Sequence, residues 1–138
     1  MKVKCIYKTF EELPKETFDL LLQINELKNL NSNKPCITVG KEYIVYGIHS
    51  SLGNTWYFIA DDDYIDYPVC VLAVFFKIID PRISKYWHFD IDKNGDFSLW
   101  SPSWNQIEYY FDRLTDGEPD IVEDFKKIKE QIDLETEN

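Results

Sequence analysis

The hydrophobic pattern divides the chain into helical ends and a β-rich middle. Charged and apolar residues alternate over Lys2–Tyr7, and from Thr17 to Leu27 the apolar residues recur at helical spacing. The Asn-, Ser- and Pro-rich stretch Asn29–Pro35 then indicates a loop. The pattern therefore predicts a short strand followed by a first helix over Lys15–Lys28.

The middle of the chain is dense in β-branched and aromatic residues. Lys41–Ile48 and Thr55–Ala60 predict two strands of a hairpin, with Gly53 and Asn54 at the turn. Both strands are apolar on both faces, so we expect one face to line a core and the other to be covered by helix. The apolar stretch Tyr67–Ile79 is too long for one strand and predicts two, with a bend near Ala73 and Val74.

A second hairpin is predicted between Tyr86 and Trp100. Its first strand, Tyr86–Ile91, alternates in character. The alternation places three side chains inward, namely Trp87, Phe89 and Ile91, and their neighbours outward. Asn94 and Gly95 predict a type I′ turn, followed by the returning strand Asp96–Trp100.

Helical periodicity returns after Pro102. One helix is predicted from the spacing of Trp104, Ile107, Phe111 and Leu114, and Thr115–Glu118 ends it. Pro119 suits the first turn of a final helix. The apolar stripe of that helix is Ile121, Val122, Phe125, Ile128 and Ile132.

These elements predict a single α+β domain over residues 1–138, with an N-terminal strand and helix (1–35), a β core (39–100) and two C-terminal helices (102–134). Short strands joined by tight turns favour a small, strongly bent antiparallel sheet or a partly open barrel. Val39–Tyr43 and Ala73–Asp80 resemble the corresponding segments of SH3-like barrels. The resemblance implies an SH3-like core flanked by the N-terminal and C-terminal helices.

Composition narrows the classes of function. The chain has 15 basic and 25 acidic side chains, a net charge of −10, which repels phosphate backbones and anionic lipids, so neither nucleic acid nor membrane is expected as a partner. Such charge either maintains solubility alone or steers the protein toward a basic protein. No apolar run is long enough to cross a bilayer, and the first residues lack the pattern of a signal peptide, so we expect a cytoplasmic protein.

The three cysteines favour the same compartment. They are odd in number and widely spaced, which indicates neither a disulfide framework nor a zinc site. We expect them to be small core residues, with Cys70 inside an apolar strand as the clearest case.

Catalytic and metal-binding patterns are weak. Asp90–Asp96 matches the start of an EF-hand loop, but Ser101 stands where a bidentate Glu is needed, so a hairpin is favoured over a weak calcium site. His49 and His88 lie outside any nucleophile motif, and no Gly-rich phosphate loop is present. The sequence predicts no metal, no cofactor and no enzymatic activity.

The segment Asp61–Tyr67 concentrates acidic residues at the end of a strand, and we expect it to be an exposed loop. It is a solvated connector, a divalent metal site or a surface that faces a partner, and its two tyrosines favour the last of these. The candidate residues of this loop are Asp61, Asp62, Asp63, Tyr64, Asp66 and Tyr67. Tyr86 and Trp100 are further candidates, because a partly exposed ring beside Pro102 could border a peptide groove.

The layout of Gly40–Tyr43, Trp56–Phe58 and Lys85–Trp87 is similar to that of small bacterial immunity-type proteins from toxin–immunity loci. The resemblance implies an acidic, protein-binding inhibitor that neutralises a basic toxin or nuclease. The alternative is an SH3-like adaptor that binds a peptide through Tyr46, Tyr86 and Trp100. The sequence leaves the oligomeric state open.

Overall fold

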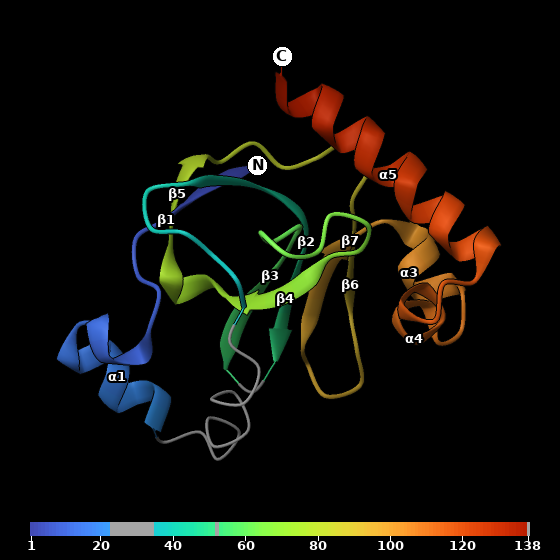
Figure 1. Cartoon of the computed structure of the whole chain (residues 1–138). Helices are drawn as coiled ribbons and strands as arrows, with labels where there is room; N and C mark the ends of the chain where they lie inside the picture. The colour runs from blue at the N-terminus through green and yellow to red at the C-terminus, as the bar shows by residue number, and fades with distance from the viewer. Residues whose placement is uncertain (23–34, 52, 138) are drawn as a thin grey trace.

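A strongly bent antiparallel sheet of seven strands forms the centre of the structure (Figure 1). The computed structural model describes residues 1–22, 35–51 and 53–137. One path through the sheet has the order β4-β3-β2-β1-β5, and β7 pairs with both β2 and β6. The strands are β1 (Lys2–Cys5), β2 (Glu42–Ser51), β3 (Asn54–Ile59), β4 (Val69–Leu72), β5 (Phe76–Asp80), β6 (His88–Ile91) and β7 (Phe97–Trp100).

The sheet bends because the long strand β2 changes partners along its length. Near its start Tyr43 pairs with Val3 of β1, whereas Ile48 further along pairs with Leu99 of β7. A register shift in the β2–β3 pairing lies between these two regions, and such bulges bend a strand. The sheet therefore curls into a barrel that is not closed. The predicted fold class, α+β with a strongly bent antiparallel sheet, is confirmed.

The two apolar segments of the middle fold as predicted. A 3-10 helix, η2 (Ala73–Phe75), separates β4 from β5, which is the bend expected within Tyr67–Ile79. In the first hairpin the pairing of β2 with β3 continues to Ser51 and Asn54, so these strands extend closer to the turn than predicted.

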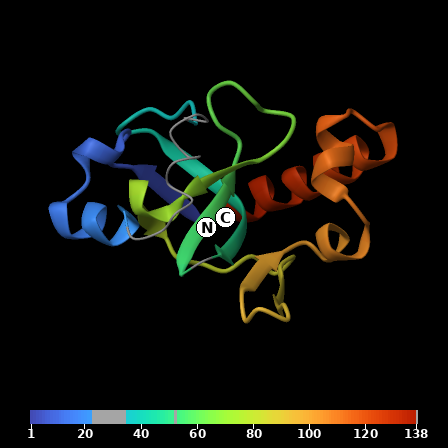
Figure 2. The same cartoon turned by 90° about the horizontal axis from the view of Figure 1, so that it is seen from below.

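Buried side chains fill both sides of the sheet. Inside the barrel, Tyr43 and Tyr57 pack against Phe76, with ring centroids 6.0 Å apart in each pair. On the outer face, Phe58 stacks on Phe111 of the C-terminal helices at 5.1 Å. Figures 1 and 2 show these helices gathered on one side of the sheet. The expectation that β2 and β3 line a core on one face and carry helices on the other is confirmed.

Gly47 allows the helices to approach the sheet closely. A Cβ atom at this position would lie 2.7 Å from Cζ3 of Trp104 and 3.1 Å from Cβ of Trp100. Real Cβ atoms essentially never lie as close as 2.7 Å to another atom, and 3.1 Å is already an unusually tight contact. Trp104 can therefore lie over the backbone of β2 only because residue 47 has no side chain.

The N-terminal helix begins where the sequence predicts. A 3-10 helix, η1 (Phe10–Glu12), precedes α1 (Lys15–Leu22). The remainder of the predicted helix, to Lys28, lies outside the described residues.

The C-terminal region holds three helices among the described residues, so the prediction of two is wrong. The segment expected to form one helix is divided into α3 (Pro102–Gln106) and α4 (Tyr110–Thr115). Tyr109 separates them with a left-handed backbone, φ 58°. The last helix, α5 (Pro119–Glu137), begins at the predicted proline. Four residues of its predicted stripe are buried, namely Ile121, Phe125, Ile128 and Ile132.

The hairpin of β6 and β7 forms as predicted, but two of its side chains are not buried. Phe89 pairs with Leu99, and Leu99 pairs with Ile48, so Phe89 lies on the face that lines the barrel, as the alternation predicts. No described element covers this face beyond the barrel, and Phe89 and Ile91 are 61% and 57% exposed. Their predicted burial is therefore wrong, whereas Trp87 is buried as expected.

The cysteines are all free thiols. Cys5 is buried as predicted, but Cys36 and Cys70 are exposed, so the prediction that they are core residues is wrong for both. In the described parts of the chain, no helix combines the length and the apolar character needed to span a bilayer.

Candidate functional site

The acidic loop that follows β3 is anchored from within by its first carboxylate. Asp61 is only 6% exposed, so the prediction of an exposed side chain is wrong at this residue. Its Oδ1 atom accepts hydrogen bonds from the backbone N–H groups of Asp63 (2.9 Å) and Tyr64 (2.8 Å). Its Oδ2 atom accepts one from the backbone N–H of Cys36 (3.3 Å). Asp61 therefore fixes the shape of the loop and is not available to a partner.

Asp62 is held by the protein's own side chains. Its carboxylate forms an ion pair with Lys41. It also accepts hydrogen bonds from the hydroxyl groups of Thr38 (2.7 Å) and Tyr43 (3.0 Å). Partial burial opposes the charged form, but the bonds from Lys41, Thr38 and Tyr43 outweigh it, and the pKa of Asp62 lies below its usual value. Much of the charge predicted to attract a partner is therefore already compensated.

The outer part of the loop remains accessible. Asp63 and Asp66 are exposed, and Tyr64 is 47% exposed. The rings of Tyr64 and Tyr67 stack with centroids 4.8 Å apart. Of the six loop candidates, Asp63, Tyr64 and Asp66 are exposed and lack an ion-pair partner among the described residues, and Tyr67 is half-buried.

The aromatic candidates outside the loop do not join it. Trp100 is buried against Phe58 and donates a hydrogen bond from Nε1 to Asn105 (3.0 Å). Tyr86 is half-buried, with the Nζ atom of Lys85 5.2 Å from its ring centroid. Tyr46 is buried and donates its hydroxyl hydrogen to Asp133 (2.6 Å). Trp100 and Tyr46 are thus core residues and cannot border a groove.

A groove lies between the acidic loop and α5. Its volume is about 460 Å³, within the range of small-molecule sites. Ile65 and Asp66 line it from the loop, and Val122, Lys126 and Lys129 line it from the helix. Lys129 already pairs with Asp133 (2.7 Å), so the groove has no strongly uncompensated charge of one sign.

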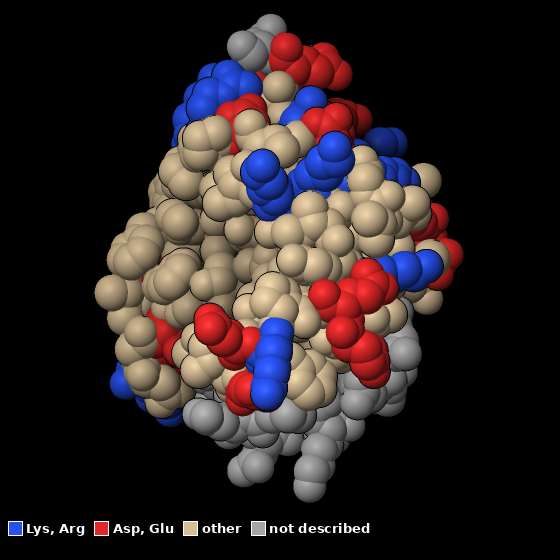
Figure 3. Space-filling view, turned by 90° about the vertical axis from the view of Figure 1, so that its left-hand side faces the viewer, with Lys and Arg blue, Asp and Glu red and all other residues tan. Residues whose placement is uncertain are grey.

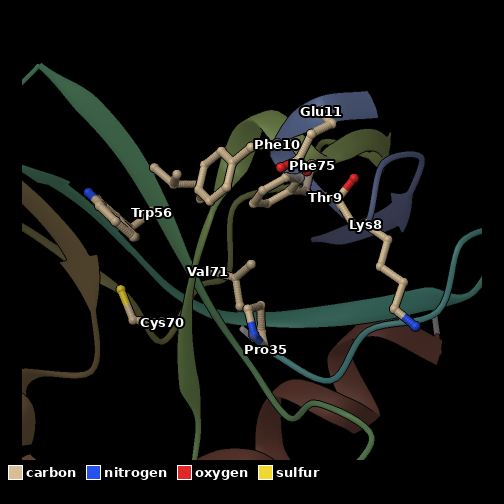
Figure 4. A pocket seen from close by; sticks show the side chains of 10 residues that line it. Lys8, Thr9, Phe10, Glu11, Pro35, Trp56, Cys70, Val71 and Phe75 are labelled. Carbon is tan, nitrogen blue, oxygen red and sulfur yellow. The ribbon is translucent and has the colours of Figure 1, made fainter. Parts of the chain in front are cut away.

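A smaller apolar hollow opens at the other end of the barrel (Figure 4). Phe10 and Phe75, whose ring centroids are 5.3 Å apart, border it on one side, and Trp56 borders it on the other. The Nε1 atom of Trp56 is buried without a hydrogen-bond partner. With a volume of about 40 Å³, the hollow has room for a single side chain rather than for a substrate.

The strongest accumulation of negative charge lies elsewhere, on the region of helices α3 to α5 (residues 101–137), which we call the helical end. It holds eleven acidic and four basic side chains, whereas residues 1–100 hold fourteen and eleven. Six of its acidic residues are exposed and have carboxylates without a hydrogen-bond or ion-pair partner among the described residues, namely Glu108, Asp112, Asp116, Glu123, Glu130 and Glu137. By contrast, the face near α1 shows both signs interspersed around an uncharged centre (Figure 3).

An exposed tyrosine lies among these carboxylates. Tyr109 is 68% exposed and directly follows Glu108. Its left-handed backbone is unfavourable for a residue with a bulky side chain. The sequence pattern around Tyr109 did not indicate a site there. The local excess of acidic residues was visible in the sequence, but the break between α3 and α4 that exposes Tyr109 was not.

The hairpin loop that resembles a calcium site uses its central carboxylate internally. Oδ1 of Asp92 accepts hydrogen bonds from the backbone N–H groups of Asn94 (2.8 Å) and Asp96 (3.1 Å). Gly95 has a positive φ but Asn94 does not, so the predicted type I′ turn is wrong. Within the described residues, no group of three or more His, Cys, Asp or Glu side chains could hold a metal ion.

The two histidines lie apart from both hollows. His49 stacks on Trp100 at 5.4 Å, and its buried Nδ1 atom has no hydrogen-bond partner. His88 is exposed on β6. Neither lines the groove at α5 or the hollow beside Phe10.

Comparison with known proteins adds no relative. No family model, no curated protein and no solved structure matches the chain.

Proposed function

We propose that this chain is an acidic protein-binding domain of the immunity type, which neutralises a basic toxin or nuclease by covering its surface. The observation that carries the proposal is the uneven distribution of charge, with eleven acidic against four basic side chains on the helical end. Negative potential concentrated on one end of a molecule accelerates and orients its encounter with a cationic protein. The proposal places the protein in the cytoplasm.

The exposed residues of the helical end fit such a contact. Glu108, Asp112 and Glu123 have no partner among the described side chains, so binding a basic group would not first require an internal ion pair to break. Tyr109 adds an aromatic ring that can be desolvated in a complex. Arg113 already pairs with Glu118 (2.6 Å) and Asp120 (3.3 Å), so those two carboxylates contribute less.

The outer part of the acidic loop, in which Tyr67 is half-buried and the other residues are exposed, gives secondary support. Asp63, Tyr64, Asp66 and Tyr67 combine two carboxylates with a stacked pair of rings. These residues are the part of the expected partner surface that remains. Asp61 is buried, and the charge of Asp62 is compensated by Lys41.

Binding is favoured over catalysis because neither the groove at α5 nor the hollow beside Phe10 contains a histidine that could serve as a general base. The groove at α5 contains lysines and carboxylates, and the hollow beside Phe10 is mainly apolar, with Lys8, Thr9, Glu11 and Cys70 also lining it. A general base must lie within hydrogen-bond reach of the group that it deprotonates, and neither histidine lines either site.

A second candidate is a peptide-binding module that uses the hollow of Figure 4. The rings of Trp56, Phe10 and Phe75 around this hollow favour it, because aromatic rings can hold an apolar side chain of a peptide. Binding in this apolar hollow would change little with ionic strength, whereas binding at the helical end would weaken as salt is added.

Recovery of the partner by charge variants tests the proposal. The immobilised protein would capture its partner from cells of its own source, with identification by mass spectrometry. We expect Glu108→Gln, Asp112→Asn and Glu123→Gln together to reduce recovery at least tenfold, because they remove unpaired charge from the helical end. A captured protein whose toxicity is suppressed by co-expression with the wild-type chain would support the immunity role.

The matched control removes the same charge from the opposite end of the molecule. Glu11→Gln, Glu16→Gln and Asp19→Asn change exposed residues near α1, which Figures 1 and 2 place far from α4. This variant should recover the partner as the wild type does. Equal loss in both variants would mean that only the total charge matters and would contradict a dedicated surface.

A further inference from the structure

The strand β6 presents a free edge with an alternating pattern of side chains. Among the described residues it pairs only with β7, and all four of its residues are exposed. The hairpin projects from the body of the molecule, as Figure 2 shows. Exposed, apolar edge strands are where proteins accept a further strand.

The register identifies the backbone groups that face outward. The N–H of Asp92 donates to the C=O of Asp96 (2.9 Å), so this pair is hydrogen-bonded. Hydrogen-bonded and non-hydrogen-bonded pairs alternate along an antiparallel ladder, so Asp90 with Ser98 is also a hydrogen-bonded pair. The N–H and C=O groups of Phe89 and Ile91 are therefore directed away from β7, toward the free edge.

The side chains of β6 differ between its two faces. Phe89 and Ile91 continue the inner face of the barrel, and the ring of Phe89 stacks on Phe97 at 6.0 Å. Asp90 lies on the opposite face, and Asp96 lies in the loop that follows. Neither of these carboxylates has a hydrogen-bond or ion-pair partner among the described side chains. An added strand would thus meet apolar groups on one face and negative charge on the other.

We propose that β6 is the docking edge for an extended segment of a protein partner, in which apolar residues alternate with Lys or Arg. The apolar residues would pack on Phe89 and Ile91, and the basic residues would lie beside Asp90 on the opposite face. The proposal deepens the proposed function, on which it rests for the basic character of the partner. A second copy of the chain is a poorer occupant, because each copy carries a net charge of −10 and would place a second Asp90 at the junction.

A short synthetic peptide of alternating lysine and valine tests the proposal. We expect it to bind and to slow the hydrogen exchange of the Phe89 and Ile91 amides, measured by NMR, while the Asp90 amide, already bonded to β7, changes little. A peptide of alternating glutamate and valine should bind at least tenfold more weakly. Unchanged exchange at Phe89 and Ile91 in saturating lysine–valine peptide would overturn the proposal.

Backbone methylation separates strand addition from simple charge attraction. Two further peptides carry N-methyl groups on all valines or on all lysines. In the extended peptide, the N–H groups of the valines point to one edge and those of the lysines to the other. Only the set that points toward β6 forms hydrogen bonds with it, so one methylated peptide should lose binding and the other should retain it. If both bind as the parent does, attraction between side chains accounts for binding and no strand is added.

Protein variants provide the matching test. Ile91→Pro removes an N–H that β7 does not use, so the hairpin should persist while peptide affinity falls at least tenfold. If the proline variant does not fold, Phe89→Lys serves the same purpose. It replaces an apolar contact with a positive charge, which repels the lysines of the peptide. Peptide binding by both folded variants at wild-type affinity would contradict the proposal.

Two measurements distinguish this proposal from the proposed function and from self-association. If Ile91→Pro recovers the cellular partner as the wild type does while the helical-end variant does not, the function stands and the β6 edge is not its docking site. If sedimentation shows a wild-type dimer that Ile91→Pro converts to a monomer, the edge pairs with a second copy and the proposal is overturned.

Discussion

Tyr109 combines an unfavourable backbone with an exposed side chain. Its φ of 58° lies in the left-handed region, and its side chain is 68% exposed, so little burial offsets the strain. Strained residues of this kind are frequent at functional sites. The position beside Glu108 is consistent with selection for a contact.

Replacing Tyr109 therefore separates stability from binding. We expect Tyr109→Gly to raise the free energy of unfolding by about 1 kcal/mol, because glycine adopts the left-handed region without steric cost. The same variant should recover less partner, because the aromatic ring is lost. Chemical denaturation and the capture assay measure the two effects. Lower stability together with unchanged recovery would show that the ring serves the fold.

Asp62 should make stability depend on pH. Its pKa in the folded protein lies below the usual value of 3.8, because hydrogen bonds and the ion pair outweigh partial burial. A lowered pKa contributes stability that is present above the unfolded pKa and is lost as the pH falls through the folded pKa. Asp62→Asn should thus be less stable than the wild type at about pH 7, with a smaller difference at about pH 2. Thermal unfolding at both pH values measures this, and a constant difference would argue against the charged interaction.

The residues of the acidic loop show what a sequence can and cannot predict at this scale. Four aspartates at the end of a strand predict a polar loop, and a loop is found. That Asp61 turns inward depends on the N–H of Cys36, which is distant in the sequence. That Asp62 meets Lys41 likewise depends on how β2 and the loop are brought together. Such long-range partners leave no local signal.

At the scale of elements, periodicity predicted most strands and the last helix, and its failures have physical causes. The spacing of Trp104, Ile107 and Phe111 suits one helix, but the chain turns at Tyr109. The turn allows Phe111 to stack on Phe58. It also allows Trp104 to make an edge-to-face contact with Phe111, with ring centroids 4.9 Å apart. Packing on the sheet therefore outweighs the continuity of the helix.

The hairpin of β6 and β7 illustrates a different limit. Alternation assigned Phe89 and Ile91 to the correct face of the sheet, but it does not show whether anything covers that face. In an open barrel the inner face extends beyond the core, and here it is exposed.

Two phenylalanines, one buried and one exposed, test whether burial decides how much a side chain contributes to stability. Phe125 on α5 is 1% exposed and packs against Tyr46, with ring centroids 6.0 Å apart. We expect Phe125→Ala to lower the free energy of unfolding by about 3–5 kcal/mol, because it leaves a cavity between α5 and the sheet. The same change at exposed Phe89 should cost about 0.5 kcal/mol. Chemical denaturation of both variants checks this, and equal losses would contradict the packing described.

At the scale of the whole molecule, composition indicated the class of partner but not the surface. A net charge of −10 predicts repulsion from nucleic acid and attraction to basic proteins. The densest short run of aspartates, Asp61–Asp63, predicted the partner surface in the loop after β3. In three dimensions that run is partly compensated, and the larger excess lies on α3 to α5, where it is spread through the sequence.

The helical end and the β6 edge also suggest how one partner could be held. Charge on the helices would steer the encounter, and strand addition would slow dissociation. Changes at the helical end should then act mainly on the association rate, and changes at β6 mainly on the dissociation rate.

The most direct test of the central claim is the association rate constant of the captured partner at two ionic strengths, about 0.05 M and about 0.5 M. We predict that the wild-type rate falls at least tenfold between them. The variant with Glu108→Gln, Asp112→Asn and Glu123→Gln should associate more slowly at low salt and respond less to added salt, while the α1 control behaves as the wild type. Equal rates for all three proteins, unaffected by salt, would contradict the claim that the acidic helical end recognises a basic partner.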